Sequence, residues 1–383
     1  DSGSTHFAAM KKDQGFWPAT MYLEGLDQYR GWFQSSLLTA VGAFGEGAPF
    51  KECVTHGWTV DGEGRAMHKS LGNGVDPADI FNENGADILR LWAASADYHA
   101  DVRCSKAIFQ QLSQNYLKFR NTCKFMLDNL VDFDPAHLTK AEDMPVLDRW
   151  LITKLNELIE KVEQSYNDYE FHIITHAVND FCVTTLSSFY LDIVKDRLYC
   201  EAADSAERRS AQTALYLTLS TLAKLFAPIL AFTCDEIWLA MPHTAEDDAR
   251  NVVLNDMNKP FTAYALDAET MARWEHIIEV RTAVNGALEE ARASKVIGKS
   301  LEADVHLTVP EGDVFLADEN PAALADLFIV SKVELTVGGE LAVKVENAAG
   351  TKCPRCWKHS LTPNAEGLCP RCAEVVRHLP DLL

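Results

Sequence analysis

Residues 151–166 read LITKLNELIEKVEQSY, and this stretch decides the fold class. Its apolar residues recur at steps of four, three, one, three and four, which is the spacing of one face of a helix. They are Leu151, Leu155, Leu158, Ile159, Val162 and Tyr166. Because a helix with one apolar face must bury that face against other elements, the pattern predicts a helical bundle. Further helices are predicted over 105–130, 171–200 and 205–240.

The segments that flank this bundle differ from it in their predicted secondary structure, because they contain strands as well as helices. Before it, a helix over 31–41 with an apolar side of Trp32, Leu37, Leu38 and Val41, and a β-branched strand over 54–60, predict an α/β unit. After it, a helix over 271–300 and alternating strands over 305–309, 333–337 and 341–345 predict a small α+β unit. We therefore predict a mainly α, multidomain chain divided into 1–95, 96–270, 271–350 and 351–383.

Composition narrows the class of protein. The chain has 383 residues and a formal charge of −21, which argues against a generally basic nucleic-acid-binding protein but leaves room for a local basic surface. No apolar run reaches the roughly 20 residues of a membrane span, and the first residues are not those of a signal peptide. Six scattered cysteines are predicted to be reduced core thiols, so we expect a cytoplasmic protein and no membrane partner.

The last segment carries two Cys-Pro-Arg-Cys sequences separated by twelve residues. Two cysteines three positions apart fit one tight turn, and two such turns complete a tetrahedral Zn²⁺ site. A pair of redox-active CxxC motifs is the alternative, but that chemistry needs a strand-to-helix junction that this short tail does not offer. The prediction is one structural Zn²⁺ per chain, whose binding folds the tail. The four ligands are Cys353, Cys356, Cys369 and Cys372.

A glycine-rich turn at 61–64 leads into the sequence RAMHKSLGN, residues 65–73. A mobile loop with a lysine beside a serine and a glycine can close over a polyphosphate, where the ammonium balances the charge of leaving pyrophosphate. An exposed turn without function is the alternative interpretation of the loop alone.

The loop resembles the KMSKS signature of the class I aminoacyl-tRNA synthetases. Met67, Lys69 and Ser70 match that signature, whereas Ala66 and His68 depart from it. The sequence DSGSTH at 1–6 and YLEGLDQYRGWF at 22–33 are similar to segments of the bacterial isoleucine-specific enzymes. The sequences GADILRLW at 85–92, SFYLD at 188–192 and KDRLY at 195–199 are similar to tRNA-contacting regions of the same enzymes. The resemblance covers essentially the whole chain.

The resemblance implies a partial Rossmann-type catalytic core, an anticodon-binding bundle, a small α+β unit and a zinc ribbon. It further implies roles for individual residues. Lys69 would be the catalytic residue and, with Met67, Ser70, His56 and Gly57, would bind ATP. The isoleucyl-adenylate would be bound by Glu24, Gly25, Asp27, Gln28 and Trp32. For His56, a strand-end histidine with structural partners only is the alternative.

The implied function is ATP-dependent activation of L-isoleucine and its transfer to tRNA(Ile), with Mg²⁺ entering as the ATP complex. Candidate tRNA contacts are Lys195, Arg197, Arg355, Trp357 and Arg371. Trp357 could stack on a base or pack beneath its knuckle, the turn formed by residues 353–356.

The other class I signature, HIGH, and the editing insertion do not occur in the sequence, and its start has no Met. We therefore expect a monomeric C-terminal portion of a longer enzyme that binds tRNA but is inactive alone. The rival hypotheses are a stand-alone zinc-ribbon RNA-binding module and a valine or leucine enzyme.

Overall fold

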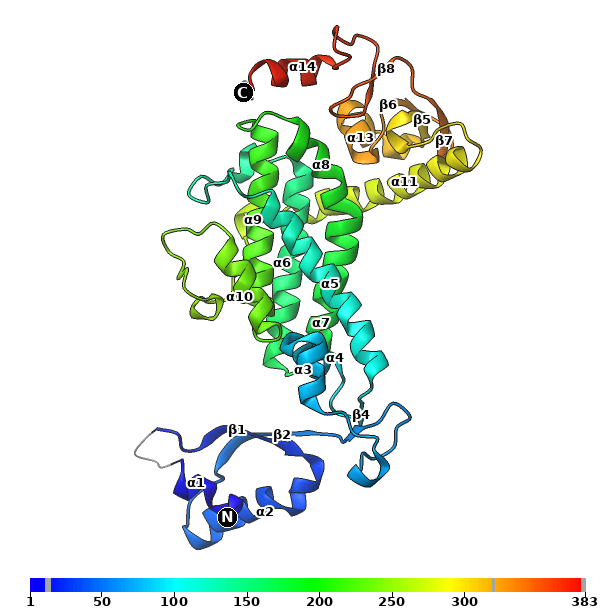
Figure 1. Cartoon of the computed structure of the whole chain (residues 1–383). Coiled ribbons are helices and arrows are strands. Elements are labelled where there is room, and N and C mark those ends of the chain that lie inside the picture. The colour runs from blue at the N-terminus through cyan, green and yellow to red at the C-terminus, as the bar shows by residue number, and fades with distance from the viewer. Residues whose placement is uncertain (11–14, 319–320, 380–383) are drawn as a thin grey trace. The chain divides into compact units, whose positions relative to one another are not determined.

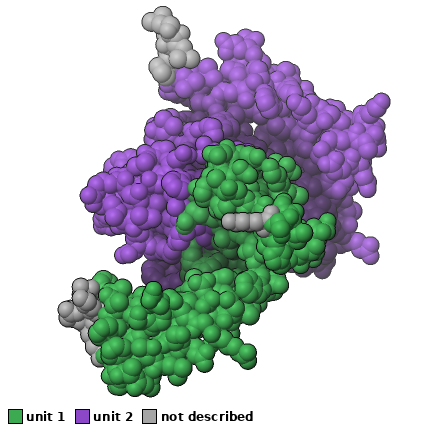
Figure 2. Space-filling model, turned by 60° about the horizontal axis from the view of Figure 1, so that its bottom comes forward, with its two compact units in different colours: residues 1–117, 165–176 green, residues 118–164, 177–383 purple. Residues whose placement is uncertain are grey.

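The structure, a computed structural model, describes residues 1–10, 15–318 and 321–379. The chain divides into two compact units, one of residues 1–117 with 165–176 and the other of residues 118–164 with 177–383 (Figure 2). Helices predominate among the described elements (Figure 1), so the chain is mainly α and multidomain. None of the described helices is long and apolar enough to cross a membrane.

The first unit begins with a β–α–β arrangement. Strand β1 (Ala19–Gly25) runs parallel to β2 (Phe50–His56), with Tyr22 opposite Cys53 and Glu24 opposite Thr55. Parallel neighbours need a crossover connection, and here α2 (Trp32–Leu38) and a π-helical turn at Thr39–Ala43 supply it. The carboxyl ends of the two strands therefore lie side by side.

The predicted strand over 54–60 is wrong as a single element, because it changes partner at Gly57. The amide of Gly57 donates to the carbonyl of Tyr98, and a Cβ on Gly57 would lie 2.4 Å from the carbonyl oxygen of Ala100. Only glycine fits this close approach. The chain then continues as β3 (Thr59–Val60), which pairs with β4 (Val102–Arg103).

The apolar side predicted for the 31–41 helix is also wrong. Leu37, Leu38 and Val41 are exposed and Trp32 is half-buried, whereas the buried residues of this segment are Phe33, Ser36 and Ala40. The buried face is partly polar because the Ser36 hydroxyl lies 2.9 Å from Tyr22 Oη and 3.2 Å from His6 Nδ1. Hydrophobicity alone could not identify this face.

The first unit continues through three helices around a small core. Helix α3 (Pro77–Asn84) starts at Asp76, whose side chain accepts from the amide of Ala78. Helix α4 (Ala86–Ser95) and the start of α5 (Lys106–Asp128) complete the packing. The core residues are Ile80, Ile88, Cys104 and Phe109.

The helical bundle belongs mostly to the second unit. In α6 (Val146–Asn167) the predicted apolar stripe is buried from Leu151 to Val162 and half-buried at Tyr166. Most of α9 (Ala206–Phe226) is buried as well. The predicted 205–240 helix is two helices, because Pro228 lies between α9 and α10 (Ala231–Ala240) and cannot donate a backbone hydrogen bond.

The predicted 171–200 helix is continuous, but its middle third is π-helical and not α-helical. It comprises α7 (Phe171–Asp180), a π-helix at Phe181–Tyr190 and α8 (Leu191–Cys200). In the π-helix the Ser188 hydroxyl donates to the carbonyl of Val183, five residues earlier, at 2.7 Å.

The three strands predicted after the bundle are present, whereas the helix predicted over 271–300 ends earlier, at Ala293. Helix α11 (Ala268–Ala293) precedes strands β5 (Ala303–Val309), β6 (Lys332–Val337) and β7 (Ala342–Asn347), with α13 (Pro321–Phe328) between β5 and β6. The sheet order is β6-β5-β7, and alternate residues of β5 are buried. Short helices occur at α1 (Thr5–Ala8) and α12 (Phe315–Asp318).

The tail contains β8 (Thr351–Lys352), β9 (His359–Ser360) and α14 (Pro370–Arg377). All ten cysteines are free thiols. Of the six scattered ones, five are buried as predicted, but Cys53 is exposed on β2, which corrects the prediction that all six are core thiols.

Candidate functional sites

The carboxyl ends of β1 and β2 bring together residues that lie about thirty positions apart in the sequence. Gly25 is opposite His56, and His56 Nε2 lies 4.0 Å from Glu24 Oε1. His56 Nδ1 lies 2.8 Å from the carbonyl oxygen of Gly57. Ligands of parallel α/β sheets bind outside the carboxyl ends of the strands. Glu24, Gly25, His56 and Gly57 are therefore placed where such a ligand would lie.

The turn after β1 adds three of the predicted residues to this edge. The side-chain amide of Gln28 donates to Asp27 Oδ2 at 2.8 Å, and Gln28 Oε1 accepts from the amide of Trp32 at 3.1 Å. The Trp32 ring lies 4.7 Å from the ring of Tyr22, measured between centroids. Gln28 thus caps the first turn of α2, and the Trp32 ring packs against Tyr22 in the middle of β1.

The loop over 61–73 is held closed by a carboxylate that sequence analysis did not single out. Asp61 is buried and accepts hydrogen bonds from the amides of Glu63 and Arg65, the Arg65 guanidinium and the Asn73 side chain, at 2.9–3.0 Å. The Arg65 amide, the Asn73 side chain and the Arg65 guanidinium hold the pKa of this carboxyl well below its usual range. The sequence signal was an aspartate at the start of a glycine turn, which is too common to indicate four hydrogen bonds.

Asn73 closes the loop from its other end. Its side-chain amide also donates to the carbonyl of Ala66 at 3.1 Å, and its oxygen accepts from the amide of His68 at 2.9 Å. Met67 packs on the small core of the first unit, and Ser70 is exposed. The backbone of Lys69 begins a 3-10 turn, Lys69–Leu71, but its side chain lies outside the described part of the structure. Arg65, the nearest other cation, is paired with Asp61 and Glu63.

Replacing Asp61 with alanine is expected to open this loop locally. Four donors would lose one shared acceptor, so the amides of residues 62–73 should exchange with solvent roughly tenfold faster or more. Hydrogen exchange followed by mass spectrometry measures this. Glu63→Ala, which removes only a surface ion pair of the same loop, should leave the exchange nearly unchanged. Equal exchange in the two variants would contradict the role of Asp61.

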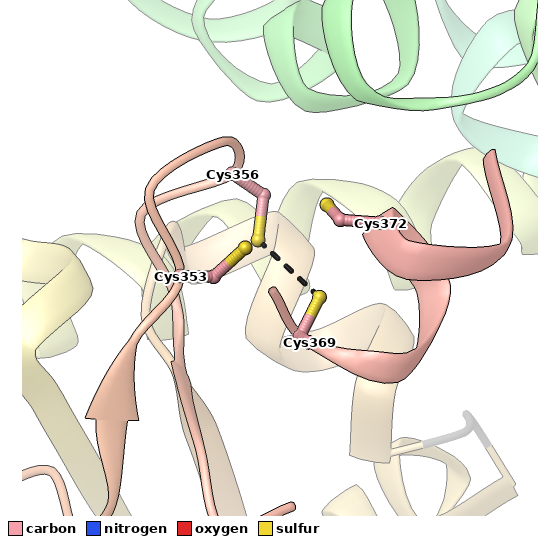
Figure 3. Close-up of side chains that lie close together, drawn as sticks. All are labelled: Cys353, Cys356, Cys369 and Cys372. Carbon is pink, nitrogen blue, oxygen red and sulfur yellow. Dashed lines mark hydrogen bonds between the residues drawn. The ribbon is translucent and has the colours of Figure 1, made fainter. Parts of the chain in front are cut away.

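The four paired cysteines form one cluster (Figure 3). Cys353 and Cys356 lie on one loop and face Cys369 and Cys372, at the start of α14. The four sulfur atoms lie within 4.8 Å of one another, and those of Cys356 and Cys369 are 3.7 Å apart. Four sulfurs around a tetrahedral metal with bonds of about 2.3 Å lie about 3.8 Å apart. The cluster therefore fits a metal ion.

The electrostatic surroundings differ among the four cysteines, since burial raises the pKa of the Cys356 and Cys372 thiols. Burial alone would raise the pKa of the Cys353 thiol, but backbone amides of Cys356, Cys369 and Arg355 outweigh it and lower this pKa to about 6. A guanidinium nitrogen of Arg355 also lies 3.7 Å from the sulfur of Cys372. Donors of this kind stabilise the negative charge that metal ligation requires.

Two of the five predicted tRNA contacts are exposed. Trp357 is 54% exposed, so it does not pack beneath its knuckle, and the Lys299 ammonium lies 5.5 Å from its ring centroid. Lys195 is exposed and forms a surface pair with Asp192 at 2.8 Å. Such a pair is weak and can exchange for a phosphate.

The three predicted arginines contact protein groups. Arg197 lies 3.3 Å from the buried carboxylate of Asp148. Arg371 forms a bidentate pair with Asp196 at 2.5 and 2.8 Å, and Arg355 donates to backbone carbonyls at the end of α8. That these arginines contact tRNA stays a prediction, and it requires their present pairs to open.

A cleft of about 420 Å³ lies between the tail, α8 and the end of α13. Exposed Tyr199 and Lys195 border it on α8, Trp357 and Lys358 border it on the tail, and Ile329 also lines it. Residues that the sequence places in separate segments thus share one surface, with two aromatic rings and two lysines at its edge.

The chain is similar to known proteins over almost its whole length. Residues 1–105 match the family described as tRNA synthetases class I (I, L, M and V), and residues 148–307 match the anticodon-binding domain of tRNA ligase. The isoleucine–tRNA ligase of Moorella thermoacetica is 47% identical over 99% of this chain and 43% of its own length. That of Syntrophotalea carbinolica is 47% identical over 98% of this chain and 42% of its own length. The chain thus spans less than half the length of these relatives.

A solved structure shares the fold. A LeuRS of Agrobacterium radiobacter K84, in a ternary complex with tRNA and LeuAMS, superposes with a TM-score of 0.52 at 17% identity. The match covers 77% of this chain and 31% of that one. At this identity the likeness concerns the arrangement of elements and not the residues of a site.

Proposed function

Since the chain belongs to the isoleucine–tRNA ligases of the class I aminoacyl-tRNA synthetases, we propose that it supplies the carboxyl-side part of their adenylate site and their anticodon-binding part. The observation that carries this proposal is the meeting of Glu24 and Gly25 with His56 at the ends of two parallel strands, followed directly by the closed 61–73 loop. Such an edge and loop can hold an aminoacyl-adenylate and the pyrophosphate that leaves ATP as the adenylate forms.

In the first proposed step, a carboxylate oxygen of L-isoleucine attacks the α-phosphorus of Mg-ATP. The bond to the bridging oxygen of the β-phosphate breaks, and pyrophosphate leaves with that oxygen. Lys69 stabilises the charge that develops there, with Met67 and Ser70 shaping the loop. Glu24, Gly25, Asp27 and Gln28 hold the adenylate, Trp32 packs on the isoleucine side chain, and His56 with Gly57 borders the adenine.

In the second proposed step, a hydroxyl of the terminal adenosine of tRNA(Ile) attacks the isoleucyl carbonyl and AMP leaves. The protein contributes by positioning both reactants. The 383 residues contain no His-x-Gly-His sequence, so we propose that they do not complete the first step by themselves. The reactants of this reaction are soluble. We propose that the protein acts on them in the cytoplasm, and that it does so as a monomer.

We propose that the metal is one Zn²⁺ per chain. Four sulfur ligands leave no open coordination position, so the ion would hold the tail together and take no part in the reaction. The support is the cluster itself, whose sulfur separations match a tetrahedral thiolate site.

The proposed anticodon contact is the cleft at Trp357. Single-stranded bases stack on exposed aromatic rings, and phosphates pair with exposed lysines. Trp357 and Tyr199 would supply stacking, and Lys195 would supply a phosphate contact once it leaves Asp192. With a net charge of −21 the rest of the chain repels RNA, so binding should be weak and steeply dependent on salt.

A titration at low salt tests the proposal. The 383-residue chain should bind isoleucine tRNA roughly tenfold or more tightly than the same tRNA with an altered anticodon. Trp357→Ala should weaken binding by about 1–3 kcal/mol, the usual contribution of one stacked base. Leu361→Ala removes another exposed apolar side chain of the tail, one that does not line the cleft, and should have little effect. Equal affinity for the two tRNAs would defeat the proposal.

A further inference from the structure

The arginines of the two Cys-Pro-Arg-Cys knuckles both contact the end of α8. Arg355 and Arg371 occupy the third position of their knuckles, and both side chains reach the last turn of α8. Arg355 donates to the carbonyl oxygens of Tyr199, at 3.2 Å, and Cys200. Arg371 binds both carboxylate oxygens of Asp196 and also lies 2.8 Å from Glu201 Oε1. The tail is thus attached to α8 by two guanidinium groups.

These contacts provide hydrogen-bond partners both for the two arginines and for the groups at the end of α8. The last carbonyls of a helix have no partner within the helix and carry partial negative charge, so a cation is stabilising there. The hydrogen bonds that Arg371 donates to Asp196 are the main reason why the pKa of Arg371 is raised. Burial by itself would raise the pKa of Asp196, but Arg371 outweighs it and the pKa is lowered. A phosphate could recruit Arg371 only by displacing two carboxylates.

The same contacts define one wall of the cleft. Trp357 directly follows the ligand Cys356, and its amide donates to the carbonyl of Cys353 at 2.9 Å. Its position therefore depends on the folded knuckle and on how the knuckle sits against α8. Beneath the attachment, Cys200 is only 6% exposed and packs with three of the clustered cysteines and Leu368.

We propose that Arg355 and Arg371 are positioning residues, which hold the metal-folded tail against the end of α8 and so form the cleft at Trp357. They act on RNA through Trp357 and do not contact phosphate themselves. This part of the inference rests on the proposed function, whereas the attachment can be tested without RNA.

The attachment is tested by alkylating the zinc-loaded chain and mapping the modified cysteines by mass spectrometry. Arg371→Gln should keep one zinc per chain yet raise the rate of Cys200 modification roughly tenfold or more. Cys123, Cys182 and Cys234 lie in the bundle core and should stay protected, which excludes general unfolding. Arg371→Lys, which keeps the charge, should give a smaller increase. Unchanged protection of Cys200, or loss of zinc from Arg371→Gln, would overturn the proposal.

The role of Arg371 toward RNA is tested by two neighbouring substitutions on α8. Asp196→Asn removes the charge of the bidentate partner of Arg371, which keeps Glu201, and Asp192→Asn removes the charge of the partner of Lys195. If Arg371 only positions the tail, Asp196→Asn should weaken tRNA binding several-fold while Asp192→Asn strengthens it. If Arg371 binds phosphate, both substitutions should strengthen binding, and the proposal fails. Absence of all tRNA binding would count against the proposed function, and the alkylation result would still decide the attachment.

Discussion

Replacing Cys356 with serine is expected to release the metal and unfold the tail from residue 351 onward while leaving the helical bundle folded. The tail has almost no core of its own, since the buried residues of its cluster are Cys353, Cys356, Leu368 and Cys372 together with Cys200 of α8. Structural zinc sites of this kind contribute roughly 10–16 kcal/mol of apparent binding free energy, which is folding free energy for so small a segment. Losing one of four thiolates should forfeit most of it.

Elemental analysis and circular dichroism measure the two parts of this expectation. Zinc should fall from one per chain to none, whereas the helical signal should change little because α5–α11 do not depend on the cluster. Cys53→Ser changes an exposed thiol outside the cluster and should retain the metal. Purification of the unaltered chain without chelator and without any bound zinc would show that the cluster is not a zinc site.

Replacing Asp148 with alanine is expected to destabilise the second unit by about 3–5 kcal/mol. Asp148 is fully buried and accepts hydrogen bonds from Tyr190 at 2.8 Å, Ser210 at 2.5 Å and Arg197 at 3.3 Å. Without the carboxylate, the guanidinium of Arg197 loses its ion-pair partner, and the hydroxyls of Tyr190 and Ser210 lose theirs. The penalty combines the lost pairing with the cost of buried groups left unsatisfied.

Urea unfolding followed by circular dichroism gives the change in stability. Asp143→Ala is the matched control, because this aspartate is exposed nearby and a surface substitution typically changes stability by less than about 0.5 kcal/mol. A difference of less than 1 kcal/mol between the two variants would contradict the role assigned to Asp148. The same network shows that substituting Arg197 tests bundle stability before it tests RNA binding.

The elements with strong periodicity could be predicted from the sequence. The helices α5 and α6 and the strands β5–β7 are present, and the apolar stripe of α6 and alternate residues of β5 are buried. The spacing of the cysteines likewise predicted a cluster that the structure brings together. These signals are local, so no knowledge of distant partners was needed.

Two of the wrong predictions involve partners that are distant in the sequence. The strand at 54–60 changes neighbour at Gly57 because Tyr98 and Ala100 approach it, and the inward face of α2 is polar because Ser36 meets Tyr22 and His6. The pairing of Arg371 with Asp196 could not be predicted either, because the two residues lie 175 positions apart. Charge and hydrophobicity are properties of a single side chain, whereas the residue that it contacts depends on the folded structure.

The π-helix at Phe181–Tyr190 makes the chain intolerant of changes in length at this point. Each residue of an α-helix turns the following side chains by about 100°. Deleting or inserting one residue in this stretch would rotate Asp196 and Cys200 away from the tail even though no contact residue had been altered. In alignments of homologous sequences, gaps should therefore be rare at 181–190 and frequent in the irregular segments on either side of α10. An added residue in an irregular segment does not rotate the side chains of a continuing helix.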